Sequence, residues 1–573
     1  MTATPAPASA AGSGPGATTA APDGRLPIVI GVTGHRHLRP ADVPKYREYV
    51  CELFTLLRRR YPSTPLRIVT ALAEGADRLV AEVALEGGHE LLVPLPLAPA
   101  DYEHDFPETT AEFRSILSRV PPEQVFVLPQ DEDSEPGLPT PQDGREKRYR
   151  AVGMLLAQHT HVLLALWDGR PAESNAGTAA VVRMKLEGPS GIPEAGLRPL
   201  DAEDGGPVYH IHARRAGEPA EHTLNNPEWM FPQEGDEALF RTLCGRIERF
   251  NGEPLRRSLA SSLPQAARAL LPDIDSRTAG GRTLAYAFAA ADLLARHYQR
   301  TTRVVLRLAL LCAATLALIF ELYAEIVHSR LLPAAYLAAF ASLTIILLWQ
   351  GRRDVQGRYL DYRALAEGLR VQFYWRLAGL HDSASSSYLR KQADELRWIR
   401  EALRAAAALP PPDTAHPELA LEHWVGGQAA YYADRAHSQR HRLHILERRS
   451  RFFLGAGLIA NSLLVVFWTQ LEALPTWHRW IVVLMGFAPI AAALWETYAE
   501  RLGLRTQVNQ YARFAGIFRR AGRFAERLER EPGRHDRHHA LVALLRELGR
   551  EALMENGDWV LLLRERPIVL PKG

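Results

Sequence analysis

Cysteine is scarce in this chain, with three residues in 573: Cys51, Cys244 and Cys312. They lie far apart in the sequence, so no two have the spacing of a metal-binding or redox pair. We therefore expect no metal site and no disulfide framework. We interpret the three as reduced thiols of a protein that faces the cytosol.

An excess of charge of one sign is also lacking, because 68 Lys and Arg residues balance 65 Asp and Glu residues to a net charge of +3. No stripe of basic residues interleaved with aromatic ones occurs outside the flanks of the apolar segments. The sequence therefore predicts no nucleic-acid partner.

Residues 1–24 contain almost no charge and consist mainly of Ala, Pro, Gly, Ser and Thr. A signal peptide needs a basic start and an apolar core, and neither is present. We expect a disordered tail here. The remaining length is too great for one core, so we expect two to four domains.

Residues 25–250 alternate between strand-like and helix-like segments. Apolar segments predict strands at 28–32, 66–72, 90–97, 125–128, 161–167 and 208–215. Segments with helical patterns lie between them at 42–61, 75–88, 109–119, 145–160 and 177–187. This alternation predicts an α/β domain with a doubly wound parallel sheet and helices on both faces.

Three of the expected strands end in polar loops that contain glycine. Ligands of such sheets bind beyond the carboxyl ends of the strands, where helix N-termini favour phosphate or carboxylate groups. One such loop alone is an ordinary polar turn, but three at one sheet edge favour a nucleotide-like ligand. The candidate ligand-binding residues are Gly31, Thr33, Gly34, His35, Arg36, Glu74, Gly75, Asp77, Asp168, Gly169, Gly177 and Thr178.

Four motifs in this region resemble the SLOG superfamily, which includes the lonely-guy phosphoribohydrolases. They are GVTGHR (31–36), LAEGADRLVAEVAL (72–85), PLPLAPADYEHDF (94–106) and LLALWDG followed by AGT (163–169 and 176–178). The resemblance implies a Rossmann-like fold over about residues 25–250 and recognition of a nucleotide-derived ligand.

Hydrolases of that superfamily carry the motif PGGxGTxxE, whose glutamate is taken as catalytic. In this sequence Val181 occupies the position of the glutamate. A valine cannot move a proton, so we expect binding without turnover, no catalytic residue and no cofactor. Glu74 and Asp77 remain as alternative acids.

Long apolar segments at 304–327, 331–350, 452–471 and 477–495 dominate the second half of the chain. Each is close to the roughly 20 residues that cross a bilayer. The alternative is a set of buried helices in a large soluble protein, and the near absence of charge within the segments argues against it.

Arginines precede the first apolar segment of each pair and follow the second. The basic residues of the short loops within the pairs are only His328, Arg330, His478 and Arg479. The positive-inside rule then places both termini in the cytosol and the chain in the inner membrane as a multi-pass protein. The flanking residues are Arg300, Arg303, Arg307, Arg352, Arg353, Arg358, Arg448, Arg449, Arg451, Arg501 and Arg505.

Each pair of spans is preceded and followed by a polar helical segment, which indicates an internal repeat. We expect a linker at 251–281, a first unit at 282–406, a Pro-rich linker at 407–421, a second unit at 422–557 and a tail at 558–573.

The segments GRYLDYRALAEGLR (357–370) and WVGGQAAYY (424–432) resemble the SLATT family of two-span membrane proteins. The resemblance implies a pore-forming or membrane-perturbing effector of bacterial defence. It also implies a homo-oligomer in a lipid bilayer and, as a partner, a nucleotidyltransferase that synthesises the signal. Two alternatives stay open: a membrane-tethered nucleotide hydrolase and a membrane-anchored nucleotide-binding scaffold.

Four residues within the expected spans could serve a pore or the packing of helices. Glu321 and Glu325 would form an acidic ring at an oligomer axis or lie among the outer headgroups. Asn461, near the middle of its span, would face another helix or a water path. Pro489 would kink the fourth span.

Overall fold

The apolar segment at 28–34 forms β1 (Ile28–Gly34), the central strand of a seven-stranded sheet. In this computed structural model the described residues are 23–128, 142–171, 177–188, 205–217, 225–233, 235–253, 258–273, 279–388, 396–409, 414–530 and 534–565. The expected N-terminal tail lies outside them, except for its last two residues.

The sheet has the strand order β4-β3-β2-β1-β5-β6-β7. Neighbouring strands run parallel from β4 to β6, while β7 pairs antiparallel with β6. The predicted parallel sheet therefore has one antiparallel edge strand, β7, which the sequence analysis did not identify. The other strands are β2 (Leu66–Val69), β3 (Glu90–Leu95), β4 (Val125–Val127), β5 (Val162–Trp167), β6 (Val208–His212) and β7 (Glu228–Met230).

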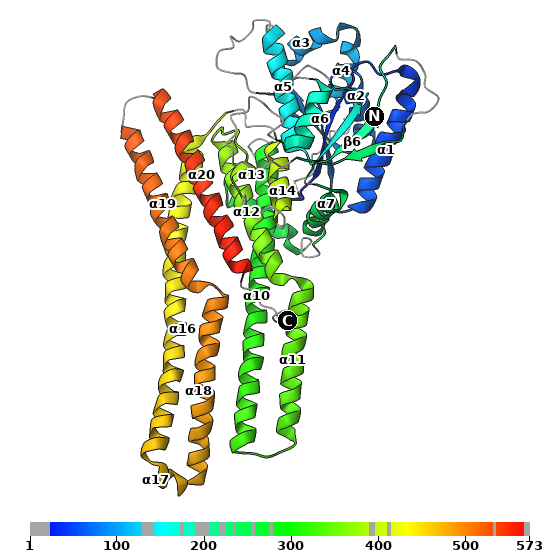
Figure 1. Cartoon of the computed structure of the whole chain (residues 1–573). Coiled ribbons are helices and arrows are strands. Elements are labelled where there is room, and N and C mark those ends of the chain that lie inside the picture. The colour runs from blue at the N-terminus through cyan, green and yellow to red at the C-terminus, as the bar shows by residue number, and fades with distance from the viewer. Residues whose placement is uncertain are drawn as a thin grey trace, which may run out of the picture.

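Helices cover both faces of the sheet. Successive side chains of a strand point to opposite faces, and the strands carry apolar side chains on both. Ile28, Ile30 and Val32 pack on the face covered by α1 (Val43–Arg60), α2 (Ala76–Glu86), α4 (Thr110–Leu117) and α7 (Glu237–Asn251). Val29 packs on the opposite face, under α5 (Gln142–His159), α6 (Thr178–Glu187) and α14 (Arg397–Ala407). Because α14 comes from the second half of the chain, this face joins the sheet to the helical region (Figure 1).

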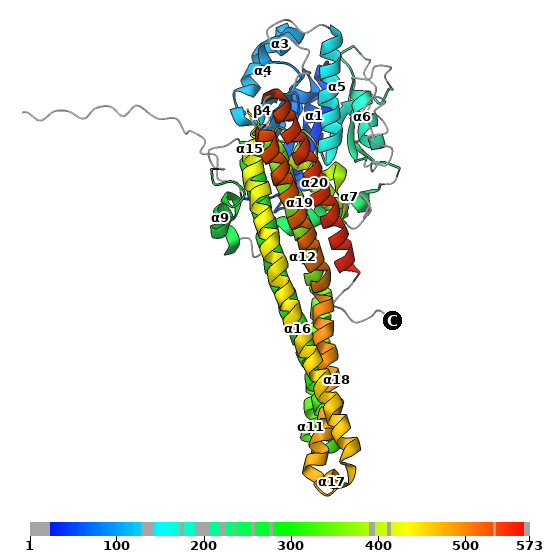
Figure 2. The same cartoon turned by 90° about the vertical axis from the view of Figure 1, so that its left-hand side faces the viewer.

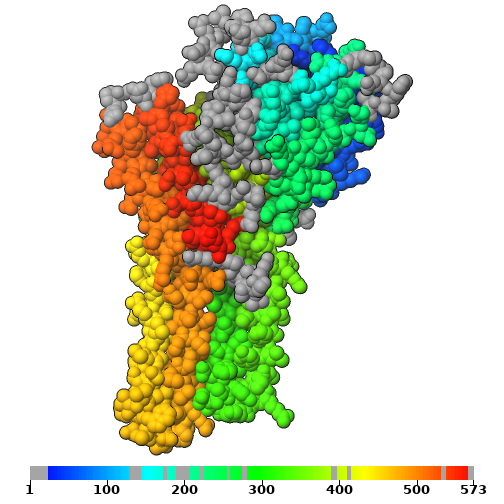
Figure 3. All heavy atoms as spheres, in the orientation of Figure 1, coloured from blue at the N-terminus to red at the C-terminus, as the bar shows by residue number. Residues whose placement is uncertain are grey.

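Two long helical hairpins extend from the sheet domain, and their loops lie at the end farthest from it (Figures 1 and 2). The first consists of α10 (Ala279–Glu325) and α11 (Leu331–Arg353), and the second of α16 (Gly427–Val466) and α18 (Pro475–Arg501). The two hairpins meet side by side in the space-filling view (Figure 3), where α10 contacts α18.

Three further long helices surround the hairpins beside the sheet domain: α12 (Val355–Leu377), α19 (Leu504–Arg530) and α20 (Arg534–Arg564). Short helices complete the chain: α3 (Pro99–Tyr102), α9 (Leu263–Arg268), α13 (Ala384–Ser387), α15 (Pro417–Ala420) and α17 (Trp468–Glu472).

Four long helical segments are long and apolar enough to cross a membrane: Gly280–Glu325, Leu331–Leu377, Pro417–Val466 and Pro475–Arg530. Their most apolar windows are only 0% to 22% buried inside the molecule. Side chains such as Leu331 (78% exposed) and Val465 (72% exposed) would face water in a soluble protein. The alternative of buried helices in a soluble protein therefore does not describe this chain.

Two elements differ in extent from the expected segments. The third span ends at Val466, because Phe467 leaves the helical conformation (φ −112°, ψ 31°) before α17 begins. The tail expected from residue 558 is helical as far as Arg564, because Val560 and Leu563 belong to the core that α20 shares with α10 and α12. In addition, α9 lies within the expected linker at 251–281.

Candidate functional site

A cavity of about 1060 Å³ opens at the carboxyl ends of the central strands (residues of β1, β5 and the loop after β2). At β1 the strand order reverses, with β2 on one side and β5 on the other. The loops that follow β1 and β5 therefore diverge, which is where ligands of such sheets bind. The volume suits a small organic ligand of nucleotide size.

Seven of the twelve candidate residues line this cavity: Thr33, Gly34, His35, Arg36, Asp77, Gly177 and Thr178. The loops after β1, β2 and β5, which were expected at one edge of the sheet, thus line one cavity. The remaining five residues lie outside the lining: Gly31, Glu74, Gly75, Asp168 and Gly169.

The glycines of the first two loops serve close packing. A Cβ atom on Gly34 would lie 2.4 Å from the Cβ of Ala76 and 2.7 Å from the carbonyl oxygen of Leu166. Gly75 has a φ of +81°, and a Cβ there would lie 2.1 Å from the carbonyl oxygen of Arg36. These glycines therefore bring the loop after β1 against the first turn of α2.

A hydrogen bond between Asp168 and His35 connects the ends of β5 and β1. The backbone N–H of Asp168 donates to Nε2 of His35 at 3.0 Å, and Oδ2 of Asp168 accepts from Nε of Arg215 at 3.1 Å. Burial would raise the pKa of Asp168, but the Arg170 backbone N–H, His35 and Arg215 together hold that pKa below its ordinary value. Asp168 therefore acts on the cavity by orienting His35 and Arg215.

Asp77 is a buried carboxyl on the cavity wall, 6% exposed. Its Oδ2 accepts a hydrogen bond from Oγ1 of Thr70 at 2.9 Å. Burial raises its pKa to about 6, although the Thr70 hydroxyl and the positive charge of Arg36 favour the ionised form. Its charge therefore changes close to neutral pH.

Arg36 supplies one accessible positive charge of the site. Its guanidinium lies 5.5 Å from the centre of the Tyr149 ring, and its side chain is exposed. No described carboxylate forms an ion pair with it. Arg145, by contrast, is held at 2.8 Å by Asp101 and at 2.7 Å by Asp105. Arg36 is therefore available to an anion.

Among the polar residues that line the same cavity and that the sequence did not single out are Tyr102, Asp105 and Tyr149. Each has a buried oxygen with no hydrogen-bond partner among the described residues, namely the two Oη atoms and Oδ2 of Asp105. Burial also raises the pKa of Tyr102 above its ordinary value. Since buried polar atoms are normally paired, these oxygens lie ready for a ligand or water.

Tyr102 and Asp105 fall within the motif at 94–106 that supports the SLOG resemblance, so that motif could have identified them. Tyr149 lies in a predicted helix without any motif, and only its position beside Arg36 reveals it.

The first turn of α6 forms the far wall. Gly177 precedes the helix, and a Cβ atom on it would meet nothing within 4 Å. Thr178 begins the helix, and Val181 is buried in the same wall. The helix start can accept an anion, and Val181 offers it no acid or base.

The four residues singled out in the spans have different surroundings. A Cβ atom on Gly486 of α18 would lie 2.2 Å from Oε1 of Glu321, so that carboxylate faces the other hairpin. Both Glu321 and Glu325 are part-buried. Asn461 is exposed on the surface of its span. The helix α18 continues through Pro489, which packs near Gly457 of α16.

The site can bind an anion next to a weakly acidic carboxyl. Among the residues that the structure describes, no group of three His, Cys, Asp or Glu side chains could hold a metal ion. In comparisons with known proteins, no family model, no curated protein and no solved structure matches this chain.

Proposed function

We propose that this chain is a membrane sensor-effector whose N-terminal domain binds a nucleotide-derived signal in the bacterial cytosol. In this proposal the domain is a Rossmann-like SLOG domain, and the helical hairpins are SLATT-type units that open or perturb the membrane. The observation that carries it is that α5 and α6 form a wall of the cavity and share a hydrophobic core with α14, a helix of the second half of the chain that contacts α5 directly.

The lining of the cavity supports a ligand with phosphate and ring groups. Arg36 and the first turn of α6 offer positive potential to a phosphate. Tyr102 and Tyr149 offer unpaired hydroxyls, and Tyr149 adds an aromatic face. The available volume of about 1060 Å³ accommodates a nucleotide.

A chain of contacts supports transmission from the cavity to the spans. On α5, His159 Nδ1 lies 3.2 Å from the carbonyl oxygen of Arg404 in α14. Near α6, Nη2 of Arg397 in α14 donates to the carbonyl oxygen of Gly205 at 3.0 Å. The helix α14 packs in turn on α12, which follows the span α11. A ligand shifts this arrangement only if it binds one state better than the other.

Buried charges reinforce the contact between α6 and α14. Lys185 donates from Nζ to the carbonyl oxygen of Ala157 at 3.1 Å, and burial lowers its pKa to about 7. Burial would raise the pKa of Glu401, but Arg404, Arg397 and Lys185 hold that pKa below its ordinary value. Movement of α6 therefore changes the electrostatics around α14.

The membrane part acts as a homo-oligomer in this proposal, with both termini in the cytosol. Asn461 supports the oligomer, because an exposed amide within an apolar span is satisfied by a partner helix and not by lipid. A nucleotidyltransferase would synthesise the signal in a defence response, as the family resemblance implies.

One observation favours a second function, a membrane-tethered nucleotide hydrolase. Asp77 lies in the cavity with a pKa of about 6, which suits a general acid or base near neutral pH. Its hydroxyl partner Thr70 and the backbone N–H groups of Ala71 and Ala73 favour a structural role instead.

Purified protein in dye-loaded liposomes separates these functions. Nucleotides are added one by one, and both dye leakage and ligand integrity are followed. Leakage with an intact nucleotide supports the sensor-effector, nucleotide destruction supports the hydrolase, and binding with neither supports a membrane-anchored scaffold. The variant Gly177→Phe should abolish the response, because its ring would enter the open cavity.

A further inference from the structure

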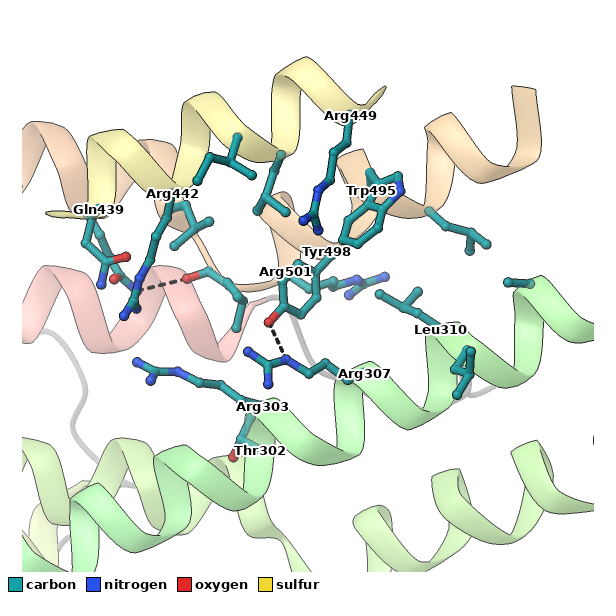
Figure 4. A pocket seen from close by; sticks show the side chains of 18 of the residues that line it. Thr302, Arg303, Arg307, Leu310, Gln439, Arg442, Arg449, Trp495, Tyr498 and Arg501 are labelled. Atoms are coloured by element: carbon teal, nitrogen blue, oxygen red, sulfur yellow. Dashed lines mark hydrogen bonds between the residues drawn. The ribbon is translucent and has the colours of Figure 1, made fainter. Parts of the chain in front are cut away.

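A second cavity, of about 770 Å³, lies between the two hairpins where their apolar spans begin. Side chains of α10, α16 and α18 point into it from different sides (Figure 4). It is remote from the sheet domain and shares no lining residue with the cavity described above.

The lining carries five positive charges and no negative one. The basic residues are Arg303, Arg307, Arg442, Arg449 and Arg501, and no Asp or Glu is among the described residues that line the cavity. The first four form no ion pair with any described residue. Figure 4 shows Arg303, Arg307 and Arg442 pointing into one space. Mutual repulsion makes such a cluster costly unless an anion enters.

The neighbouring cavity, on the side of the sheet domain, holds two carboxylates among seven arginines. Asp292 accepts from Arg296 at 2.6 Å, and Glu367 accepts from Arg370 at 3.0 Å. The two cavities share Arg303 and Arg442. The protein therefore compensates part of the positive charge in the neighbouring cavity, whereas no described residue that lines the second cavity does so.

The far part of the second cavity is apolar. It is lined by side chains of the spans themselves: Leu310, Leu311, Ala314, Phe453, Phe487 and Leu494. Aromatic residues mark the boundary, where Arg307 Nε donates to Oη of Tyr498 at 2.9 Å and Arg449 lies 4.9 Å from the Trp495 ring centre. Tyrosine and tryptophan in such positions are typical of the membrane interface.

We propose that this cavity binds one anionic phospholipid of the cytosolic leaflet between the two hairpins. Arg303, Arg307 and Arg442 bind its phosphate, and its acyl chains lie along the apolar side chains of the spans. A soluble phosphate compound would satisfy the arginines but would leave the apolar half of the cavity empty, so the lining favours a lipid. The site is independent of ligand binding in the sheet domain.

Native mass spectrometry of the full-length protein in detergent tests this site. The protein is titrated with phosphatidylglycerol and, separately, with phosphatidylcholine. We expect one tightly bound phosphatidylglycerol, and the double variant Arg303→Gln/Arg442→Gln should bind it at least about tenfold more weakly. The matched control is Arg352→Gln/Arg448→Gln, which removes two flanking charges that do not line the cavity. It should stay within about twofold of the wild type.

Three results would overturn the proposal: equal binding of both lipids, equal loss in the control variant, or tighter arginine-dependent binding of ATP or inorganic phosphate in lipid-free detergent. The last would identify a soluble phosphate as the occupant. Size-exclusion chromatography checks folding. If the double variant fails to fold, the single variant Arg442→Gln gives the same comparison, because its side chain is exposed.

Discussion

Glu253 and Arg358 form an ion pair, with Oε1 of Glu253 3.0 Å from Nη1 of Arg358. Glu253, just after α7 of the sheet domain, also accepts hydrogen bonds of 2.9 Å from the hydroxyls of Tyr298 in α10 and Tyr362 in α12. It is 4% exposed. One buried carboxylate thus joins the sheet domain to the two helices that continue into the first hairpin.

Glu253→Ala should destabilise the protein by about 2–4 kcal/mol, because it leaves the part-buried charge of Arg358 without its carboxylate and the hydroxyls of Tyr298 and Tyr362 without their acceptor. Thermal unfolding in detergent measures the effect. Glu253→Ala/Arg358→Met should recover part of the loss. As a control, Glu48→Ala breaks the exposed pair with Lys45 and should leave the stability almost unchanged, because solvent screens such a pair. An equal loss in both single variants would contradict the bridging role.

Gly34 and Gly177 both line the ligand cavity but should respond differently to substitution. Gly34→Ala should cost about 1–3 kcal/mol, because its Cβ would lie 2.4 Å from that of Ala76. Gly177→Ala should change stability by no more than about 0.5 kcal/mol, because its Cβ meets nothing within 4 Å. Unfolding measurements distinguish the two variants. A large loss of stability for Gly177→Ala would mean that Gly177 packs against other residues and does not border an open cavity.

Asp77 should make stability depend on pH. Its pKa is about 6 in the folded protein against an ordinary value of 3.8, so the folded state binds the proton more tightly. The resulting stabilisation is complete below about pH 4 and is lost as the pH rises through about 6, a change of about 3 kcal/mol. Unfolding curves of the wild type between pH 4 and 7 should show it.

The variant Asp77→Asn cannot ionise at this position, so its free energy of unfolding should not show this loss. The stability of the variant relative to that of the wild type should therefore increase as the pH rises from 4 to 7. A difference that stays constant from pH 4 to 7 would mean that the pKa of Asp77 is not raised.

Cys51 reports the proposed topology, because it is exposed on α1 of the sheet domain. A membrane-impermeant maleimide should label it after cell lysis but not in intact cells. In a Cys51→Ser background, His328→Cys should be labelled in intact cells, since His328 is exposed in the loop between α10 and α11. The reverse labelling pattern would invert the topology.

The pattern of apolar residues predicted six of the seven strands and the two helical hairpins, because strand and span lengths are local properties of the sequence. The strand β7 was not predicted, because its three residues become a strand only by pairing with β6. Tyr149 could not be identified as a cavity residue, since only tertiary packing brings it beside Arg36. Nor does the sequence show that α14 packs against a face of the sheet whose strands come far earlier in the chain.

Lys185 tests whether α14 transmits the signal, because its amine lies between α5 and α6 and close to Glu401 but does not line the cavity. Lys185→Met should leave nucleotide binding within about twofold of the wild type and abolish nucleotide-dependent leakage. The exposed Lys147 on α5 gives a matched control, since Lys147→Met removes the same charge away from α14.

Lys185 also provides a readout without any ligand. Its pKa is about 7 in the folded protein against an ordinary value of 10.5, so the unfolded chain carries more protons between these values. The wild type should therefore gain stability from pH 7 to pH 9, and Lys185→Met should not. If Lys185→Met keeps both the gain in stability and the leakage of the wild type, neither the buried amine nor α14 transmits the signal, and the route from the cavity to the spans must run through another contact.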